Sequence, residues 1–197
     1  MSQQRCQILA VVAFSVALAP AVSRVTAQEE SSRSRSLGKA VVEYRDDAIQ
    51  VVAAYYYSQR NHDSRWLLIE SALSTADPAT IHRTAIHLRT PQGRDIALAD
   101  QRRVGDDVNA IQQLLQNART VRHDVASYFV QRDRVESMQF FTLPFGGVVH
   151  DEFVVDRDRV AVGPLFFESP TGAWERGTYT LVVRHPKGIA ELPIRLE

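Results

Sequence analysis

The second half of the chain carries short segments in which apolar and polar residues alternate, separated by turn residues. In the segment that begins at Gly177, the side chains of Tyr179, Leu181 and Val183 fall on one face. Over residues 160–197 the pattern predicts three strands in an antiparallel meander. So small a sheet is marginally stable alone in water, and its apolar face therefore requires a second layer from the rest of the chain.

Earlier stretches supply further strands. Residues 49–57 are apolar on both faces, which is typical of a central strand. A polar turn joins them to 66–73, and a Pro-Gln-Gly turn joins 81–90 to 95–98, so the pattern predicts two hairpins. Residues 148–155 add a strand before the meander. The sequence thus predicts an all-β chain with one inserted helix, folded as an antiparallel β-sandwich of about seven to nine strands.

The inserted helix is predicted where the alternation stops. Apolar residues recur at spacings of three and four between Val108 and Ala118, directly after Asp106 and Asp107, which can cap a helix. We therefore expect a helical insertion around 106–120. The following residues, 121–131, fit a helix and a strand equally well.

The N-terminus has the layout of a secretory signal peptide. Arg5 precedes an apolar run that begins at Ile8, and small residues lead up to Ala27. The run is shorter than the roughly 20 residues of a membrane-spanning helix, so cleavage near Ala27 is preferred over a retained anchor. We predict a signal peptide over 1–27, a polar, disordered linker over 28–43 and a single β-sandwich domain over 44–197. The mature chain would have no membrane span and would be periplasmic or secreted.

Composition narrows the chemistry. The one cysteine, Cys6, lies in the predicted leader, which excludes disulfides, thiolate metal sites and cysteine nucleophiles from the mature chain. Loss of Arg5 and Arg24 with the leader leaves two more acidic than basic residues. Nucleic acid is therefore not an expected partner.

Two short segments resemble known proteins. The run Gly177-Thr178-Tyr179-Thr180-Leu181 resembles the Gly-x-Tyr-x-Leu pattern near the end of immunoglobulin-like sandwiches in bacterial envelope or secreted proteins, and residues 86–94 resemble the strand and turn of extracellular modules of that kind. The resemblance implies a sandwich in which Tyr179 caps a corner between the sheets. The Cys-Trp-Cys framework of antibody domains is absent, so the resemblance concerns architecture and not activity.

Specific catalytic, cofactor and metal motifs are absent from the sequence. The six histidines show no metal-binding spacing, and no serine lies in a Gly-x-Ser-x-Gly turn. The acidic cluster over 150–158 offers oxygens for calcium, but a charged and solvated turn explains it more simply. We predict no catalytic residue, no cofactor and no metal ligand.

Aromatic residues are the better indication of a function. Tyr55, Tyr56 and Tyr57 cannot all point inward along one strand, and Trp66 lies opposite its neighbour Leu67. The four rings Tyr55, Tyr56, Tyr57 and Trp66 form a candidate binding surface, unless the helix over 108–118 covers that face. The resulting hypothesis is an exported, non-enzymatic module that contacts another envelope or secreted protein. The alternative is a small exported hydrolase that uses carboxylate chemistry.

Overall fold

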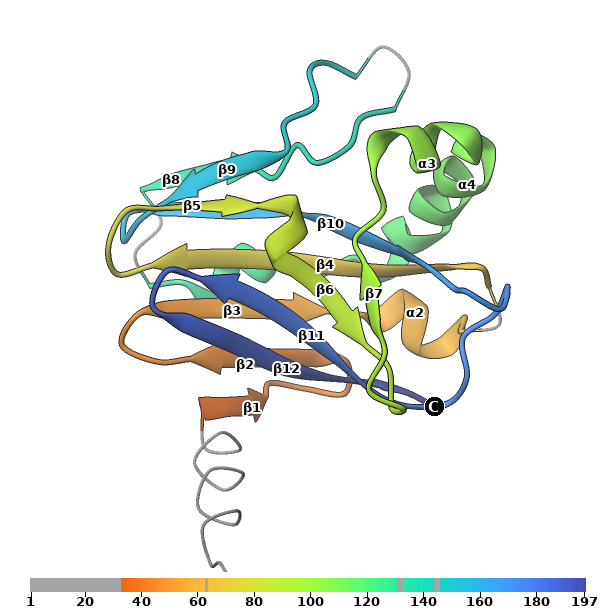
Figure 1. Ribbon diagram of the computed structural model, residues 1–197, viewed down its shortest axis with the longest axis horizontal. Coiled ribbons are helices and arrows are strands. Elements are labelled where there is room, and N and C mark those ends of the chain that lie inside the picture. Colours follow the sequence, from red (N-terminus) through yellow and green to blue (C-terminus); the bar gives the residue numbers. More distant parts are fainter. Residues whose placement is uncertain (1–32, 63, 131–132, 144–145) are drawn as a thin grey trace, which may run out of the picture.

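A computed structural model describes residues 33–62, 64–130, 133–143 and 146–197 (Figure 1), so the predicted signal peptide lies outside the described residues. The fold is mostly β, and its largest sheet has the order β1-β2-β3-β4-β10-β8. All neighbours in this sheet are antiparallel except β10 and β8, which are parallel. The strands are β1 (Ser34–Ser36), β2 (Val41–Arg45), β3 (Ile49–Ala54), β4 (Trp66–Thr75), β10 (Arg159–Glu168) and β8 (Arg134–Ser137).

A smaller sheet of order β12-β11-β6-β7 faces the large one, and β5 pairs with β9 as a separate two-stranded ladder. These strands are β12 (Gly188–Leu196), β11 (Gly177–His185), β6 (Ile86–Arg89), β7 (Asp95–Ala97), β5 (Ala79–His82) and β9 (Glu152–Val155). The α-helices are α2 (Tyr56–Arg60), α3 (Gln101–Asp106) and α4 (Val108–Ala118). Three 3-10 turns also occur, η1 (Arg83–Ala85), η2 (Arg119–Val121) and η3 (Val125–Tyr128).

The main core lies between the two sheets. The large sheet contributes side chains such as Ile69 and Leu165, which are paired across β4 and β10, and the small sheet contributes Leu88, Leu181 and Leu192. All five are at most 1% exposed. The alternation in β11 and β12 follows from this arrangement, because one face of the small sheet packs on the core, although Val182 and His87 on its other face are buried as well.

Helix α4 explains why β4 and β10 are apolar on both faces. Its residues Ile111 and Leu114 pack on Trp66, Leu68 and Phe166, which point away from the main core. A second cluster lies beside this one on the same outer face, where η3 packs over β2, β3 and β4. Helix α4 and η3 therefore cover the outer face of the large sheet.

Several sequence predictions are confirmed. The fold is β-rich, α4 begins at Val108 and ends at Ala118 as the periodicity predicts, and β6 with β7 forms the expected hairpin around Pro91-Gln92-Gly93. The ambiguous stretch 121–131 contains η3 over Val125–Tyr128. In the large sheet, β1, β2, β3 and β4 lie next to one another in the order in which they occur in the chain. The resemblance to immunoglobulin-like modules stays a prediction.

The predicted meander over 160–197 is wrong in one respect. Strands β11 and β12 pair as expected, but β10 belongs to the large sheet, between β4 and β8. Residues 169–176 connect the two sheets. A tight hairpin needs only two to five residues, whereas this longer connection can cross the roughly 10 Å between packed sheets.

The predicted linker over 28–43 is also wrong where the chain is described. Ser34–Ser36 forms β1, and Val41–Arg45 forms β2, with Val42 and Tyr44 in the main core. Strand pairing uses backbone groups, so the polar side chains of β1 do not prevent it.

Other element boundaries differ from the prediction. The strand predicted over 49–57 ends at Ala54, where α2 follows, and the strand predicted over 81–90 is divided by η1. Short strands raise the total to twelve in the described residues, above the predicted seven to nine. The described helices include none that is both long and apolar enough to cross a membrane.

Candidate functional site

The structure buries two of the four aromatic rings predicted as a binding surface. Tyr55 is 5% exposed and belongs to the main core, and Trp66 is 3% exposed beneath α4, where its indole N–H donates to Asp107 at 2.7 Å. Tyr56 and Tyr57 are half-buried against the clusters of the outer face. The covering helix therefore accounts for the second apolar face, and only Tyr56 and Tyr57 reach the surface.

Tyr56 leads to a polar site on the same outer face. Its ring lies 5.6 Å from the ring of His123, and the ring of Tyr128 lies 5.4 Å from His123 on centroid distances. The Nε2 atom of His123 is 2.7 Å from the Tyr128 hydroxyl. Two tyrosines thus hold this histidine next to the large sheet.

Glu70 is the acidic member of this site. It stands in the middle of β4 on the outer face, at the seam between the two outer clusters, with Ala54 and Pro164 as its neighbours on β3 and β10. Its Oε1 atom is 3.0 Å from Arg122 Nε, and its Oε2 atom accepts a hydrogen bond of 3.1 Å from the backbone N–H of His123. Burial raises the pKa of the Glu70 carboxyl, and both hydrogen-bond donors act against that rise.

A hollow of about 410 Å³ opens beside Glu70 and is also lined by Asp124 and Ser137. Gly163 and Pro164 of β10 line it just after the pairing with β8 ends at Val162, and Pro164 has no backbone N–H with which to extend that pairing. A Cβ atom at Gly163 would lie 2.8 Å from that of Met138, so only glycine fits there. The acids of this hollow are already engaged, since Asp124 Oδ1 accepts from the backbone N–H of Ala126 at 3.1 Å and Glu70 uses both oxygens.

A second hollow, of about 520 Å³, separates the edges of the two sheets between β1 and β12. Two of its charged side chains, Arg35 and Glu191, form ion pairs. Glu43 of β2 binds Arg35, and Arg89 Nη1 lies 2.8 Å from Glu191. Pro193 interrupts the free edge of β12, which protects an edge strand against pairing with another chain.

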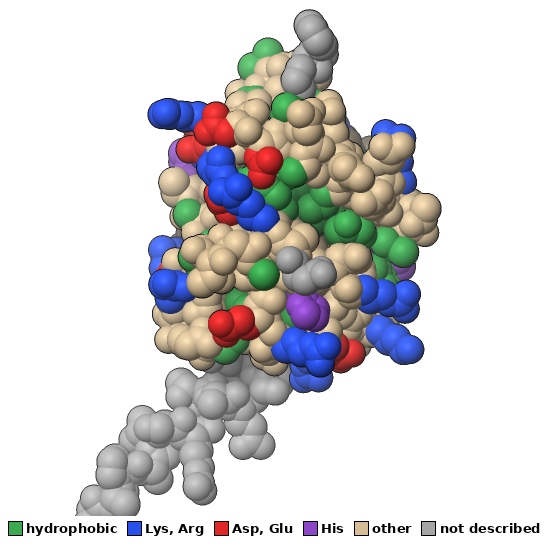
Figure 2. Space-filling model, turned by 90° about the vertical axis from the view of Figure 1, so that its right-hand side faces the viewer, with side chains coloured by type: hydrophobic (Ala, Val, Ile, Leu, Met, Phe, Trp, Pro, Cys, Tyr) green, Lys and Arg blue, Asp and Glu red, His purple; other side chains and the backbone are tan. Residues whose placement is uncertain are grey.

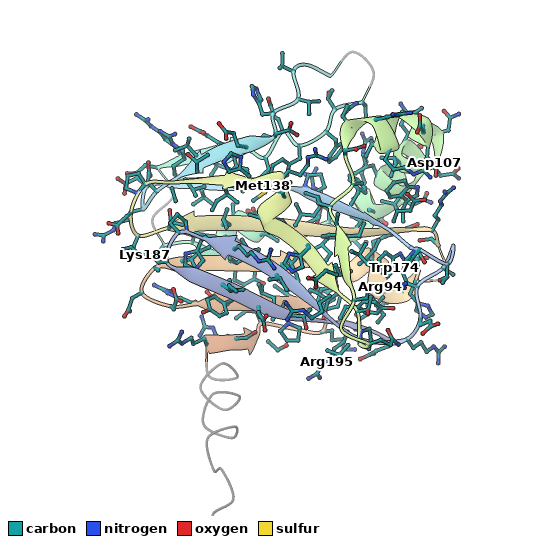
Figure 3. All side chains as sticks on the ribbon, in the orientation of Figure 1. Arg94, Asp107, Met138, Trp174, Lys187 and Arg195 are labelled. Atoms are coloured by element: carbon teal, nitrogen blue, oxygen red, sulfur yellow. The ribbon has the colours of Figure 1, made fainter. Side chains whose placement is uncertain are left out.

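The third hollow lies at the end of the sandwich where two connections meet. It has a volume of about 460 Å³, and we call it the end-loop cleft. One wall is the β6–β7 turn, and the other is the β10–β11 loop over 169–176. Arg94 of the turn and Trp174 of the loop lie next to each other in Figure 3 and both line the cleft. The lining residues are Thr90, Gln92, Arg94, Ile96, Ser169, Pro170, Thr171, Ala173, Trp174, Glu175 and Tyr179.

Hydrogen bonds hold the wall formed by the β6–β7 turn. The backbone N–H of Thr90 donates to Arg94 O at 2.8 Å, and that of Gly93 donates to Thr90 O at 2.9 Å. The Thr90 hydroxyl also accepts from the backbone N–H of Arg94 at 3.1 Å. The turn is therefore closed from both sides, while the side chains of Gln92 and Arg94 are exposed.

The β10–β11 loop is held as firmly. Trp174 donates from its backbone N–H to His62 O at 2.8 Å and from its indole N–H to Arg65 O at 3.2 Å. The Tyr179 hydroxyl donates to Glu175 O at 3.0 Å, and the Tyr179 ring meets that of Trp174 edge-on at 5.4 Å. Tyr179 thus makes the backbone bond that the sequence resemblance implies for a corner tyrosine.

The two walls carry the charged residues Arg94 and Glu175. Within the described residues, no carboxylate lies within 4.0 Å of the Arg94 guanidinium, and no basic group lies within that distance of the Glu175 carboxylate. The floor of the cleft is the edge of the core, since Trp174 and Tyr179 are each 4% exposed. Figure 2, which views the right-hand side of Figure 1, shows basic and acidic side chains around a band of hydrophobic ones on that side of the molecule.

The acidic cluster considered for calcium is spread over separate contacts. Asp151 pairs with Arg83 at 3.0 Å, Glu152 lies 3.0 Å from His82, and Asp156 Oδ1 accepts from the backbone N–H of Arg159 at 2.8 Å. Among the residues that the structure describes, no group of three or more His, Cys, Asp or Glu side chains could hold a metal ion.

Sequence reasoning missed both the Glu70 site and the end-loop cleft. A detectable signal existed for Glu70, because a charged residue interrupts the apolar outward series Trp66, Leu68, Ala72 on a strand that is buried on both faces. The cleft had no such signal, since residues almost 80 positions apart form its walls.

Comparison with known proteins finds no matching protein family and no match among curated proteins. Among solved structures the chain is similar to a protein of Bacillus subtilis subsp. subtilis str. 168 described as a "putative lipoprotein (ycdA)", with 13% sequence identity and a TM-score of 0.41. The similarity covers 78% of this chain and 38% of that protein, so the chain spans well under half of its length.

Proposed function

We propose that the protein is an exported, non-enzymatic β-sandwich module that acts by binding a component of the cell envelope or another secreted protein. The observation that carries this proposal is the end-loop cleft. Its two walls are held by backbone and side-chain hydrogen bonds, while Arg94 and Glu175 have no ionic partner in the described residues. A preformed cleft with uncommitted polar groups binds a ligand at little cost in ordering.

The sequence supports export independently. The signal-peptide pattern ends at Ala27, and the mature chain would begin at Gln28. Expression of the full chain with a C-terminal tag in a bacterial host tests this step. We expect tagged protein outside the cytoplasm with an intact mass that starts at Gln28, and retention of the full-length mass in the cytoplasm would contradict it.

A sedimentation assay with isolated envelope fractions tests the binding function. We expect the wild-type protein to sediment with the fraction that contains its partner, and the double variant Arg94→Gln, Glu175→Gln to remain in the supernatant. Arg176→Gln is the matched control, because Arg176 is exposed, follows Glu175 directly and does not line the cleft. Equal sedimentation of the double variant and the wild type would contradict the assignment of binding to the cleft.

The alternative function, a hydrolase with carboxylate chemistry, would use the hollow beside Glu70. The raised pKa of Glu70 favours it, since a general acid needs a carboxyl that holds its proton. Against it, Glu70 already binds Arg122 and His123, which attaches the segment 122–126 to the sheet, and Asp124 already accepts a hydrogen bond from Ala126 within that segment. Turnover of glycoside or ester substrates that Glu70→Gln abolishes without loss of folding would establish the hydrolase and overturn the binding proposal.

A further inference from the structure

We infer that the end-loop cleft binds a small zwitterionic molecule, with a free carboxylate against Arg94 and a cationic nitrogen against Glu175. This inference rests on the proposed binding function and names its ligand class. Its first support is the pair of charges on the two walls, Arg94 and Glu175, for which the described part of the chain holds no ionic partner. An anion alone would leave Glu175 without a partner and would be repelled by it, and a cation alone would be repelled by Arg94 in the same way.

The geometry of the donors fits this class. A guanidinium presents two parallel N–H groups to a carboxylate, which is the strongest common form of carboxylate recognition in proteins. The Glu175 side chain accepts hydrogen bonds from an ammonium group, and Gln92 can both donate and accept beside them. A volume of about 460 Å³ lies within the range of small-molecule sites.

Contacts within the chain hold the two walls of the cleft. Pro91 of the turn touches the start of β11, since a Cβ atom at Gly177 would lie 3.2 Å from Pro91 Cγ. The Thr90 hydroxyl and the Tyr179 hydroxyl each fix the backbone next to one of the charged residues, Arg94 and Glu175. Binding then requires ordering of the two charged side chains but not of the loops, which lowers its entropic cost.

The apolar lining distinguishes this ligand from a sugar. Sugar rings are commonly recognised on the open face of an aromatic side chain, but Trp174 and Tyr179 are each 4% exposed and engage each other. Half-buried Ile96 and exposed Pro170 form the accessible apolar surface instead. They suit the aliphatic body of an amino acid or dipeptide that also carries the two charged groups.

Titration of the wild-type protein with the dipeptide Leu-Ala, followed by calorimetry and by the NMR signal of the Trp174 indole N–H, tests the inference. The N-acetylated dipeptide lacks the cationic nitrogen, the dipeptide amide lacks the carboxylate, and glucose represents a neutral sugar. We expect saturable binding of Leu-Ala, and binding weaker by about tenfold or more for each capped derivative, because each loses one charge-assisted contact. Trp66→Phe identifies the second indole signal.

Variants locate the site. Arg94→Gln should weaken Leu-Ala binding by about tenfold while the amide, which lacks a carboxylate, binds the variant as it binds the wild type. Glu175→Gln should likewise weaken Leu-Ala binding by about tenfold, while the acetylated dipeptide, which lacks the cationic nitrogen, binds this variant as it binds the wild type. Arg176→Gln should bind all ligands like the wild type. Equal binding of capped and free dipeptide, preferential binding of glucose, or no binding of Leu-Ala would each overturn the inference. If sedimentation with envelope fractions still depended on Arg94 and Glu175, the proposed function would stand with a different ligand.

Discussion

Replacement of Tyr179 by phenylalanine removes one hydroxyl group and leaves the ring. The structure assigns that hydroxyl a single bond, a donation of 3.0 Å to the backbone oxygen of Glu175, which returns the chain from the β10–β11 loop into β11. The ring itself is buried at 4% exposure and packs edge-on against Trp174. The substitution therefore tests the bond separately from the packing.

The expected loss is about 1 kcal/mol in the free energy of unfolding, the usual net value of one intramolecular hydrogen bond. Glu175 lies in an exposed segment, so water can reach its freed carbonyl and the cost stays below that of a fully buried, unsatisfied group. In a protein of this size, about 1 kcal/mol corresponds to a decrease of roughly 2–4 °C in the melting temperature.

Urea denaturation followed by tryptophan fluorescence measures the effect, with Thr178→Ser as a control at an adjacent exposed position. Burial raises the pKa of the Tyr179 hydroxyl, so the variant should also lose a late step from the ultraviolet titration of the tyrosines. Equal urea midpoints for the wild type and Tyr179→Phe would refute the reasoning, because the corner bond would then contribute nothing. If Tyr179→Phe lost as much unfolding free energy as Tyr179→Ala, the reasoning would be refuted as well, because the phenylalanine ring, which Tyr179→Ala removes, would then contribute nothing to stability.

Three further predictions concern stability. Gly177→Val should lower the free energy of unfolding by roughly 1–3 kcal/mol in urea denaturation, because φ is +153° there and a side chain would meet Pro91; a midpoint equal to that of the wild type would contradict the strain. The guanidinium of Arg103, with that of Arg65, lowers the pKa of Glu168 to about 2 from 4.5. The ionised Glu168 carboxylate therefore contributes to the free energy of unfolding above about pH 4.5, and this stabilisation is lost as the pH falls toward 2. Melting curves of Glu168→Gln should accordingly show a smaller decrease over that range than wild-type curves, and parallel curves would exclude the ion pair as a source of stability. Calcium or zinc should leave the melting temperature of the wild type unchanged, and a rise of several degrees would reveal a metal site.

The local pattern of apolar and polar residues was sufficient to predict an element whose own side chains reveal which of its faces is buried. The spacing from Val108 to Ala118 predicted α4 with both ends correct, and alternation predicted the pairing of β11 with β12. Tyr179 was placed both in the core and at a corner from five residues of sequence. A helix with one apolar stripe and a strand with one apolar face leave a period in the sequence, so they can be recognised without knowing what covers them.

The sequence determined less well which strands pair with each other and which elements cover them. The sequence predicted β10 as part of the final meander, but a strand that is apolar on both faces requires cover on both, and it lies within the large sheet beneath α4. Polar β1 pairs through its backbone and therefore had no side-chain signal at all. Likewise the aromatic residues Tyr55 and Trp66 could have faced solvent or a covering element, and only the position of the insertion decided between the two.

The sequence by itself determined that this is a β-rich chain with one amphipathic helix, an apolar leader pattern and no recognisable catalytic or metal motif. Only the tertiary structure formed the end-loop cleft, because Arg94 and Glu175 are 81 positions apart in the sequence and belong to two loops that meet at one end of the sandwich. The same holds for Glu70, whose partners Arg122 and His123 reach it from beyond α4. Periodicity records which face of an element is buried, whereas the meeting of two distant loops depends on how the sheets pack and leaves no period in the sequence.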